Sequence, residues 1–577
     1  MSNRTLGLMM GAVALLIVAV AVVFVLVLSG GDGDDGGDTP ARPASDSADR
    51  DDAADDRDAA SDERDEPDDG DRTTGGICGE NRLVTFGDDP ATVFDPIQVG
   101  DASTAEYTAE IFGGLVTLNL DLEVVPDIAE RWEITDGGRV YTFFLRNDVV
   151  FHNGRRVTAE DVKYSLERAA DPANFSPTVL DYLGDIVGVR DKFNGRADDI
   201  SGVQVVDEYT LRIELTEPIS YFLQQLTYTV AYVVDREQIE DDPNNWTRRP
   251  NGTGPFRVKT FRPLEEIVLI PNDRYHLGPP RVDEVVFSLS GGSLSTRFQN
   301  DEIHVALVPA VELAGVLSGE SELSEFYRPV PQLSFFYLGF NVNEPPFDDP
   351  LVRQAFAHAI NREAINEVLF FDAALVADGI LPPTLPGYSE AISTYPYDPE
   401  RAAELLAQSS YADDMPRIVL TFSGGGGDPP DNLQAYQQQW REALGVEVEI
   451  EAIEWSAYLR ELRRGTFQMY SAGWIADYPD PENFLGKLFS GSSRLNHTGY
   501  ASERVDALLD EAATLGDQEA RYRLYHEAEQ IIIDDAPIIP TFWTISHYLV
   551  RECVQNWVDP GTIVPKYRYI EIDTSGE

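Results

Sequence analysis

The chain has 577 residues, and 100 Asp and Glu against 44 Lys and Arg give it a formal net charge of −56 at pH 7. A surface this acidic repels polyanions, which argues against nucleic acid and anionic membrane surfaces as partners. A chain of this length does not fold around one hydrophobic core, so several domains are expected. The acidity suits both saline surroundings and a GC-rich genome that prefers Arg and Asp codons.

The first apolar segment, residues 5–28, contains no charged side chain. As a helix it would extend roughly 36 Å, enough to cross a hydrocarbon core of about 30 Å. A secretory signal has a shorter apolar stretch of about 7–15 residues. An uncleaved transmembrane anchor is therefore predicted, with a cleaved signal peptide as the alternative. Arg4 precedes the span and an acidic run follows it, which predicts a single span with the rest of the chain outside the cell membrane.

Residues 29–77 hold Asp-Asp and Asp-Gly repeats with some Ser and Pro, and they contain almost nothing apolar larger than Ala. Such a segment cannot bury enough surface to offset chain entropy, so a disordered acidic linker is predicted. The pattern indicates a folded body that begins near residue 78 and is tethered to a membrane by a flexible chain.

The two cysteines, Cys78 and Cys553, stand at opposite ends of the predicted body. In an external compartment a bridge between them is favoured over two free thiols. Two separate buried thiols remain the alternative at this point.

Short strands and helices fill the first part of the body. Thr158 can cap a helix, because Asp161 stands at the third following position and apolar residues then recur at helical spacing. Strands are predicted at 83–86, 114–118, 139–146, 203–206, 210–215, 256–260, 265–270 and 283–288, and one helix at 350–365.

Strands and helices alternate most clearly from residue 417 onward. Strands are predicted at 417–422, 446–453 and 467–473, with helices at 431–443 and 456–463 between them. This βαβαβ pattern predicts that the strands at 417 and 446 lie parallel in one sheet. Four glycines at 424–427 follow the first strand, but no Gly-Lys-Ser/Thr accompanies them, so a turn is favoured over a phosphate cradle.

The segment 473–481 places a carboxylate, Asp477, just beyond the last of these strands. Ligands of open α/β sheets bind outside the carboxyl ends of strands, which predicts a pocket here. The alternative is that Asp477 starts a turn and Trp474 fills the core. The chain has no nucleophile or zinc motif, so no catalytic residue, metal or cofactor is expected and the protein is not predicted to be an enzyme.

Several segments together resemble one family, the extracytoplasmic solute-binding proteins of peptide-type ABC importers (solute-binding family 5), and most of all its oligopeptide-binding members. The resemblance runs in order from residue 83 to the C-terminus. It is carried by the segments 125–133, 141–146, 151–155, 158–165, 252–256, 345–349 and 473–481.

This resemblance implies an α/β fold like that of periplasmic binding proteins, with two lobes around a ligand cleft and an extra inserted domain. Lobe I would be discontinuous, and the two cysteines would lie in it together, which favours the bridge. Hinge residues would be Tyr337 and Asn341. The implied divisions are 78–115, 247–335 and 546–577 for lobe I, 116–246 for the inserted domain II, and 336–545 for lobe II.

The resemblance also implies a binding site. Asp477 would pair with the α-ammonium of a peptide, since a charge-assisted hydrogen bond in a closed cleft fixes one end of the ligand. Backbone groups at Gly473, Trp474 and Ile475 would pair with the extended peptide, and a loop containing Gly100 and Ala102 would oppose them. Aromatic walls would come from Trp474, Tyr478 and Trp543.

The function implied by the resemblance is capture of short peptides by closure of the lobes and delivery to an ABC permease and its ATPase. The protein would act as a monomer. Two alternatives are a different solute, such as an oligosaccharide or a metal chelate, and a surface sensor that takes no part in transport.

Overall fold

A computed structural model describes residues 76–575, with short gaps at 89, 91–93 and 425–427. The predicted anchor at 5–28 and nearly all of the predicted linker at 29–77 lie outside the described residues. Among the helices that the structure describes, none combines the length and the apolar character needed to cross a bilayer.

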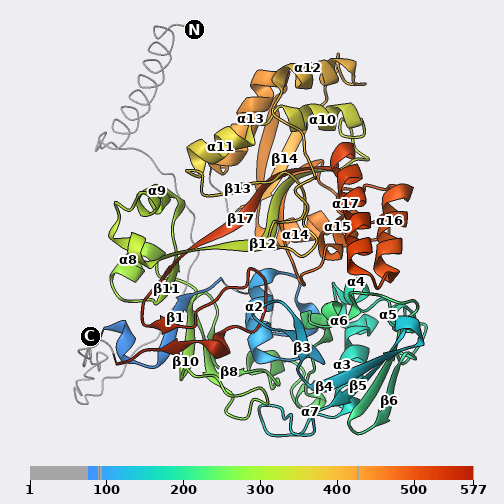
Figure 1. Ribbon diagram of the computed structural model, residues 1–577, viewed down its shortest axis with the longest axis vertical. Coiled ribbons are helices and arrows are strands. Elements are labelled where there is room, and N and C mark those ends of the chain that lie inside the picture. The colour runs from blue at the N-terminus through green and yellow to red at the C-terminus, as the bar shows by residue number, and fades with distance from the viewer. Residues whose placement is uncertain (1–75, 89, 91–93, 425–427, 576–577) are drawn as a thin grey trace, which may run out of the picture. The chain divides into compact units, whose positions relative to one another are not determined.

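Eleven strands form one sheet that runs through the body (Figure 1). The order along it is β15-β14-β16-β12-β17-β11-β1-β10-β9-β8, and β13 pairs with β17 beside this path. The bounds are β1 Arg82–Phe86, β8 Phe256–Arg262, β9 Glu266–Pro271, β10 Glu284–Ser288, β11 Val305–Leu307, β12 Tyr327–Phe340, β13 Leu375–Val376, β14 Ile418–Ser423, β15 Val448–Ile453, β16 Met469–Ile475 and β17 Ile538–Val550.

The two longest strands, β12 and β17, run antiparallel to each other and belong to both halves of this sheet. From Ser334 onward β12 also pairs with β16, whereas the far end of β17 pairs with β11. The register between β12 and β17 shifts between Pro331 and Phe335. Figure 1 shows both strands continuing from one half of the sheet into the other. Backbone hydrogen bonds on either side of this irregularity therefore connect the two halves.

The alternation predicted from residue 417 onward is confirmed. β14 pairs in parallel with β15 and with β16, and α13 (Asp431–Leu444) and α14 (Trp455–Arg463) make the connections. Trp440 of α13 is fully buried against the sheet and anchors that helix. Of the predicted glycine turn, residues 425–427 lie outside the described part of the chain.

The single helix predicted at 350–365 is wrong, because the segment forms two helices. α10 (Pro350–His358) ends before Ala359, and α11 (Arg362–Leu369) begins after Asn361. The Asn361 side chain accepts a hydrogen bond from the Ala364 backbone N–H at 2.9 Å, which caps the second helix. The apolar spacing continues across the break because both helices pack on the same core cluster.

A separate antiparallel sheet has the order β4-β5-β7-β6 and its own hydrophobic cluster. The predicted helix start is confirmed in α3 (Ala159–Ala169), where the Asp161 carboxylate accepts hydrogen bonds from the backbone and hydroxyl of Thr158, both at 2.9 Å. The strands around it are β2 Val116–Leu118, β3 Val124–Pro126, β4 Ala129–Thr135, β5 Val140–Leu145, β6 Val203–Asp207 and β7 Thr210–Glu214. The nearby helices are α4 Val179–Tyr182, α5 Val189–Phe193, α6 Phe222–Gln225 and α7 Arg236–Asp241.

The remaining elements surround the large sheet or close the C-terminus. They are α2 Ala102–Ile111, α8 Leu294–Gln299, α9 Ala310–Ser318, α12 Pro399–Gln408, α15 Glu482–Phe489, α16 Glu503–Thr514, α17 Gln518–Asp535, β18 Val554–Gln555 and β19 Glu571–Ile572.

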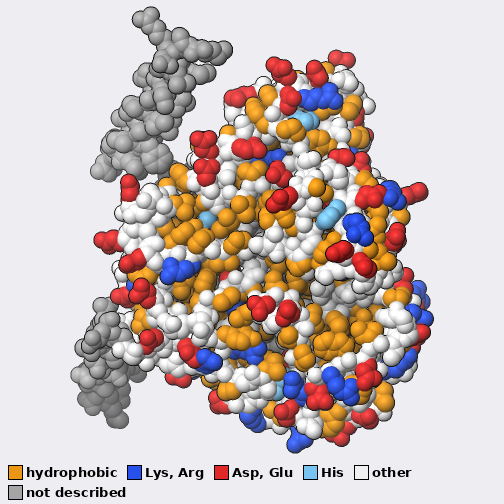
Figure 2. Space-filling model, in the orientation of Figure 1, with side chains coloured by type: hydrophobic (Ala, Val, Ile, Leu, Met, Phe, Trp, Pro, Cys, Tyr) orange, Lys and Arg blue, Asp and Glu red, His pale blue; other side chains and the backbone are white. Residues whose placement is uncertain are grey.

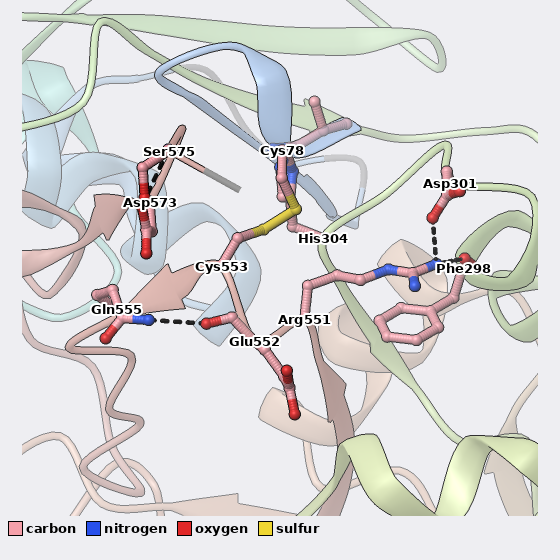
Figure 3. The surroundings of a disulfide bond; sticks show 11 residues. Cys78, Phe298, Asp301, His304, Arg551, Glu552, Cys553, Gln555, Asp573 and Ser575 are labelled. Carbon is pink, nitrogen blue, oxygen red and sulfur yellow. Dashed lines mark hydrogen bonds and ion pairs between the residues drawn. A yellow bond between two sulfur atoms is a disulfide. The ribbon is translucent and has the colours of Figure 1, made fainter. Parts of the chain in front are cut away.

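A disulfide bond joins Cys78 and Cys553, whose Cα atoms are 6.1 Å apart with a sequence separation of 475 (Figure 3). Cys78 lies just before β1 and Cys553 lies just after β17. His304 lies beside the bond, and its Nδ1 accepts a hydrogen bond from the Val84 backbone N–H at 3.0 Å. The bond therefore connects the first described residues of the body to its C-terminal segment.

Candidate functional site

The C-terminal half of β16 has a backbone edge that no described strand covers. On one side, residues 469–475 pair with β12 along their full length. On the other side, β14 pairs only with Met469 and Tyr470. Within the described part of the chain, the backbone from Gly473 to Ile475 is therefore open to an added extended strand. This is where backbone pairing with a ligand is predicted.

Asp477 follows directly after this edge, and two side chains position its carboxylate. The Tyr182 hydroxyl donates a hydrogen bond to Oδ2, and the Asn483 amide donates to the same oxygen at 3.3 Å. The other oxygen, Oδ1, accepts no hydrogen bond from the residues that the structure describes. One oxygen is thus fixed by the protein, and the second can accept from a ligand.

The surroundings of Asp477 act on its charge in opposite directions. Burial raises the pKa of Asp477 to about 6, while the hydrogen bonds from Tyr182 and Asn483 and the charge of Lys487 oppose that rise. Lys487 forms an ion pair with Glu482, with 3.4 Å between nitrogen and oxygen. A ligand ammonium at Oδ1 would favour the ionised form further, because an adjacent positive charge lowers a carboxyl pKa.

Asn483 holds the end of the strand in place. Its side-chain oxygen accepts hydrogen bonds from the Asp477 backbone N–H and from the Trp474 indole N–H, both at 3.0 Å. Asn483 itself is fully buried at the start of α15. Trp474 therefore packs against the core beneath the edge, while Gly473 and Ile475 are exposed.

The other two aromatic side chains expected as cleft walls are buried. Tyr478 is fully buried, packs edge-on against Tyr182 with ring centroids 6.2 Å apart, and donates a hydrogen bond to Glu482. Trp543 of β17 is 5% exposed and lies edge-on against Tyr388, with centroids 5.7 Å apart. In this structure both rings are part of hydrophobic clusters.

Residues that belong to the hydrophobic cluster of the four-stranded sheet cover Asp477. Tyr182 ends α4 and stacks on Tyr228 at 4.0 Å between centroids. The Lys487 ammonium donates a hydrogen bond to the backbone oxygen of Asp181, and the Ser220 backbone N–H donates to that of Ala513 at 2.8 Å. Hydrophobic side chains also reach the surface across the middle of the face shown in Figure 2. The carboxylate therefore lies between two packed parts of the body.

Of the predicted opposing loop, Gly100 precedes the cap of α2 and faces α14, whereas Ala102 is the first residue of α2 itself. Asp101 caps α2 by accepting a hydrogen bond from the Thr104 N–H at 2.9 Å, which shapes the loop. A Cβ built on Gly100 would lie 2.9 Å from a guanidinium nitrogen of Arg463. Arg463 is exposed and forms no ion pair with the described residues. The guanidinium group of Arg463 on α14 therefore lies close to Gly100, which belongs to the segment before α2.

The predicted hinge residues lie in and just after the part of β12 that pairs with both β16 and β17. Tyr337 is buried, pairs with Ala472 of β16 and stacks on Phe335 at 5.0 Å between ring centroids. Asn341 follows the strand, and its side chain donates a hydrogen bond to the Gly465 oxygen at 3.1 Å. The register of β12 against β17 shifts twice, between Pro331 and Phe335 and again between Phe336 and Tyr337, so the second shift lies at the predicted hinge residue Tyr337.

Sequence reasoning identified Asp477 but missed Tyr182, Asn483 and Arg463. Asn483 stands six residues after Asp477 in the same segment, so its proximity could have been suspected. Tyr182 lies 295 residues away and no local pattern marks it. Arg463 ends the helix before β16 between Arg460 and Arg464, and the sequence does not distinguish it from these two neighbours.

One group of potential metal ligands occurs among the described residues, formed by Cys78, His304 and Cys553. The two sulfur atoms are bonded to each other, so neither is available as a thiolate ligand. The residues around Asp477 form no such group within the described chain.

Comparison with known families gives a match over most of the body. The family described as "Bacterial extracellular solute-binding proteins, family 5 Middle" matches residues 123–496. The dipeptide-binding protein DppE of Bacillus subtilis (strain 168) is 28% identical over 501 residues, which cover 83% of this chain and 90% of that protein. The probable deoxycholate-binding periplasmic protein YgiS of Escherichia coli (strain K12) is 31% identical over 468 residues, covering 79% and 86%.

A solved structure agrees with the family match. The periplasmic binding protein DppA of Helicobacter pylori, in complex with the peptide STSA, is 28% identical and superposes with a TM-score of 0.75. The superposition covers 85% of this chain and 98% of that one.

Proposed function

Because the chain belongs to the bacterial extracellular solute-binding proteins of family 5, we propose that it captures short peptides outside the cell and delivers them to an ABC importer. Its partners would be the permease and ATPase subunits of that importer. The protein would act as a monomer, and binding alone would be its task.

One observation carries the peptide assignment. The open edge of β16 ends at a carboxylate whose Oδ1 accepts no hydrogen bond from the described residues. An extended peptide pairing with Gly473 to Ile475 would bring its α-ammonium toward Asp477, so one element would recognise the backbone and the other the charged end. Arg463, opposite Gly100, is a candidate partner for the peptide carboxylate.

Ligands of related proteins support this proposal and its alternative. The H. pylori relative was solved with a peptide, and the B. subtilis relative is named for dipeptides. The E. coli relative is named for deoxycholate, which has no ammonium group. An uncharged or anionic solute would therefore be the second candidate, and it would gain nothing from Asp477.

The proposed arrangement has two lobes that close over the ligand. Lobe I would comprise 78–115, 247–335 and 546–577, the inserted domain 116–246, and lobe II 336–545. Closure would bend β12 and β17, and the register shift near Pro331 supports a hinge there, close to the one expected at Tyr337 and Asn341. The uncharged segment 5–28 would hold the body at the outer face of the membrane, with 29–77 as the tether.

Mass spectrometry of ligand released from the purified protein tests the proposal. Peptides of a few residues in the denatured extract are the expected result, and calorimetry with the same synthetic peptides should give saturable binding. Recovery of a bile acid, sugar or metal chelate, together with no heat on titration with peptides, would assign the protein to the second candidate.

A further inference from the structure

A cavity lies between the loop that follows β13 and α17, and one of its lining residues, Trp543, pairs with the same β12 residue, Phe335, as Trp474 of β16 does. Its volume is about 230 Å³. The lining side chains that carry its chemistry are Asp378, Tyr388, Glu390, Glu529 and Trp543. Among the described residues that line it, none is Lys, Arg or His.

The buried carboxyl group that lines this cavity belongs to Glu529, which is 1% exposed. Its Oε1 accepts hydrogen bonds from the backbone N–H groups of Ile380 at 2.7 Å and Leu381 at 3.0 Å. Its Oε2 is buried and has no hydrogen-bond partner among the described residues. A buried carboxylate oxygen without a donor is costly, and either protonation of Glu529 or a donor from outside the chain relieves that cost.

Two aromatic rings form walls of the same cavity. Tyr388 and Trp543 meet nearly at right angles, with an angle of 84° and ring centroids 5.7 Å apart. The Trp543 indole N–H is buried and has no acceptor among the described residues. Aromatic faces next to a carboxylate attract cations, since the ring quadrupole adds to the charge.

The remaining polar groups fit an organic cation better than a metal ion. Asp378 and Glu390 are exposed and line the cavity with Glu529. Within the described chain, these three carboxylates do not bring one oxygen each within 4.8 Å of the others, as a bare metal ion would require. An ammonium or guanidinium group carries several N–H donors and can reach carboxylates that stand farther apart.

We propose that this cavity binds a primary ammonium or guanidinium group. The group would donate to Glu529 Oε2, lie against the faces of Tyr388 and Trp543, and be attracted by Asp378 and Glu390. It would belong either to a basic side chain of the bound peptide, a source that rests on the proposed function, or to a free cationic solute.

The charge state of Glu529 supplies an independent readout. Burial raises the pKa of Glu529 to about 7, although the N–H groups of Leu381 and Ile380 lower it. Besides Glu529, the titratable side chains that line the cavity are Asp378, Glu390 and Tyr388. A bound cation favours ionised Glu529, so binding at pH 7 should release protons. The measured enthalpy should then depend on the ionisation enthalpy of the buffer.

Calorimetry on the full-length protein in detergent compares three probes: the peptides Ala-Lys-Ala and Ala-norleucine-Ala, which differ in the side-chain ammonium, and n-butylammonium alone. A peptide source predicts that the lysine peptide binds at least about tenfold more tightly than the norleucine peptide, the usual effect of a charge-assisted hydrogen bond. A free solute predicts binding of n-butylammonium that does not depend on Asp477.

Glu529→Gln tests the assignment, because the amide keeps an oxygen for Ile380 and Leu381 but loses the charge. In this variant the two peptides should bind with nearly equal affinity, n-butylammonium should no longer bind, and the buffer dependence of the peptide-binding enthalpy should fall to the small part that Asp477 contributes. Glu511→Gln, at an exposed position on α16, is the matched control and should bind all three probes as the wild type does. If Glu529→Gln does not fold, Glu390→Gln and Trp543→Phe replace it, and each should reduce binding of the cation by a smaller factor.

The outcomes separate this inference from the proposed function. Equal affinity for the two peptides together with no binding of n-butylammonium overturns the cation site and leaves peptide binding intact. Binding of n-butylammonium that depends on Glu529, with no binding of any peptide, supports the cation site and contradicts peptide capture. A preference for lysine that survives in Glu529→Gln would also overturn the inference.

Discussion

The phenolic hydroxyl of Tyr182 donates a hydrogen bond to the carboxylate of Asp477 across 295 residues of sequence. Tyr182 belongs to the hydrophobic cluster of the four-stranded sheet, and Asp477 follows a strand of the large sheet. The bond therefore ties the proposed ligand carboxylate to the part of the body that covers it. A movement of one part relative to the other would therefore stretch or break the hydrogen bond to Asp477.

Replacing Asp477 by Asn should weaken peptide binding with little effect on folding, because the amide fits the same volume. We expect a loss of about 2–5 kcal/mol, since the ligand ammonium would remain buried and unpaired. N-acetylation of the peptide should cost the wild type a similar amount and cost the variant much less, because both changes remove the same pair. Calorimetry on all four combinations measures this coupling, and strictly additive losses would show that Asp477 only shapes a turn.

Replacing Tyr182 by Phe removes one hydrogen bond to Asp477 and keeps the ring stacked on Tyr228. Hydrogen bonds to charged groups contribute about 1.5–3 kcal/mol, and only the part of this energy that differs between the free and the bound protein enters the affinity, which should therefore fall by up to roughly tenfold. Tyr228→Phe is the matched control, because Tyr228 lies in the same stack and makes no hydrogen bond to Asp477 among the described residues. Equal effects of the two substitutions in a binding titration would contradict the role given to Tyr182.

Peptide affinity should depend on pH through Asp477. Its folded-state pKa is raised to about 6, so the unliganded protein takes up a proton there as pH falls, and a peptide ammonium must then displace that proton. Affinity should decrease below about pH 6, and above about pH 8 it should decrease again as the α-ammonium deprotonates. Titrations from pH 5 to 9 should show the acidic limb in the wild type and none in Asp477→Asn.

The same raised pKa has the opposite effect on the stability of the free protein. The native state binds the Asp477 proton more tightly than the unfolded state, whose pKa is near 3.8, so this group's contribution to the free energy of unfolding rises as pH falls from about 6 to about 4. Asp477→Asn should remove that increment from the difference between denaturation curves at the two pH values. An unchanged difference would mean that Asp477 is not perturbed by its surroundings.

The disulfide predicts a defined cross-link and a measurable contribution to stability. Peptide mapping without reductant should recover Cys78 joined to Cys553. In the chain-entropy description, closing so long a loop contributes on the order of 6 kcal/mol, so reduction should lower the unfolding temperature. Quantitative labelling of both thiols in unreduced, denatured protein would refute the bond.

The proposed anchor predicts where the intact protein is found. Native protein should sediment with membranes and begin at or near residue 1, because the segment 5–28 lacks a clear cleavage pattern. A variant lacking residues 5–28 should appear in the soluble fraction. A mature N-terminus close to Gly30 in soluble wild-type protein would identify a signal peptide instead.

The part of the fold that sequence predicts best is the part built from local alternation. The strands at β14, β15 and β16 and their two helices follow from period and turn residues alone. The break at Asn361 was missed because the apolar spacing continues across it, although Asn before Arg362 and Glu363 is an N-cap pattern. The 11-stranded sheet could not be derived in this way, since β12 and β17 are brought together by pairing over 200 residues.

In the candidate site, too, residues marked by a local pattern could be predicted and residues placed by long-range packing could not. Asp477 was found because it stands at a strand end in a distinctive segment. Tyr182 and Arg463 were missed because their positions depend on how distant parts pack. Trp474 was expected to line the ligand cleft, and this stays a prediction; its ring is partly buried against a core cluster, and Asn483 accepts its indole N–H.

Because β12 and β17 are shared by both halves of the sheet, the body cannot be divided into two self-sufficient polypeptides. Each half would lose the partner strand that covers its own edge and would expose unpaired backbone, which favours aggregation. A cut in a surface loop leaves β12 and β17 whole and able to pair again. A cut between Pro331 and Phe335 divides β12, so its two pieces no longer hold one continuous pairing with β17. Fragment complementation should therefore succeed for breaks outside β12 and β17 and fail for breaks within them.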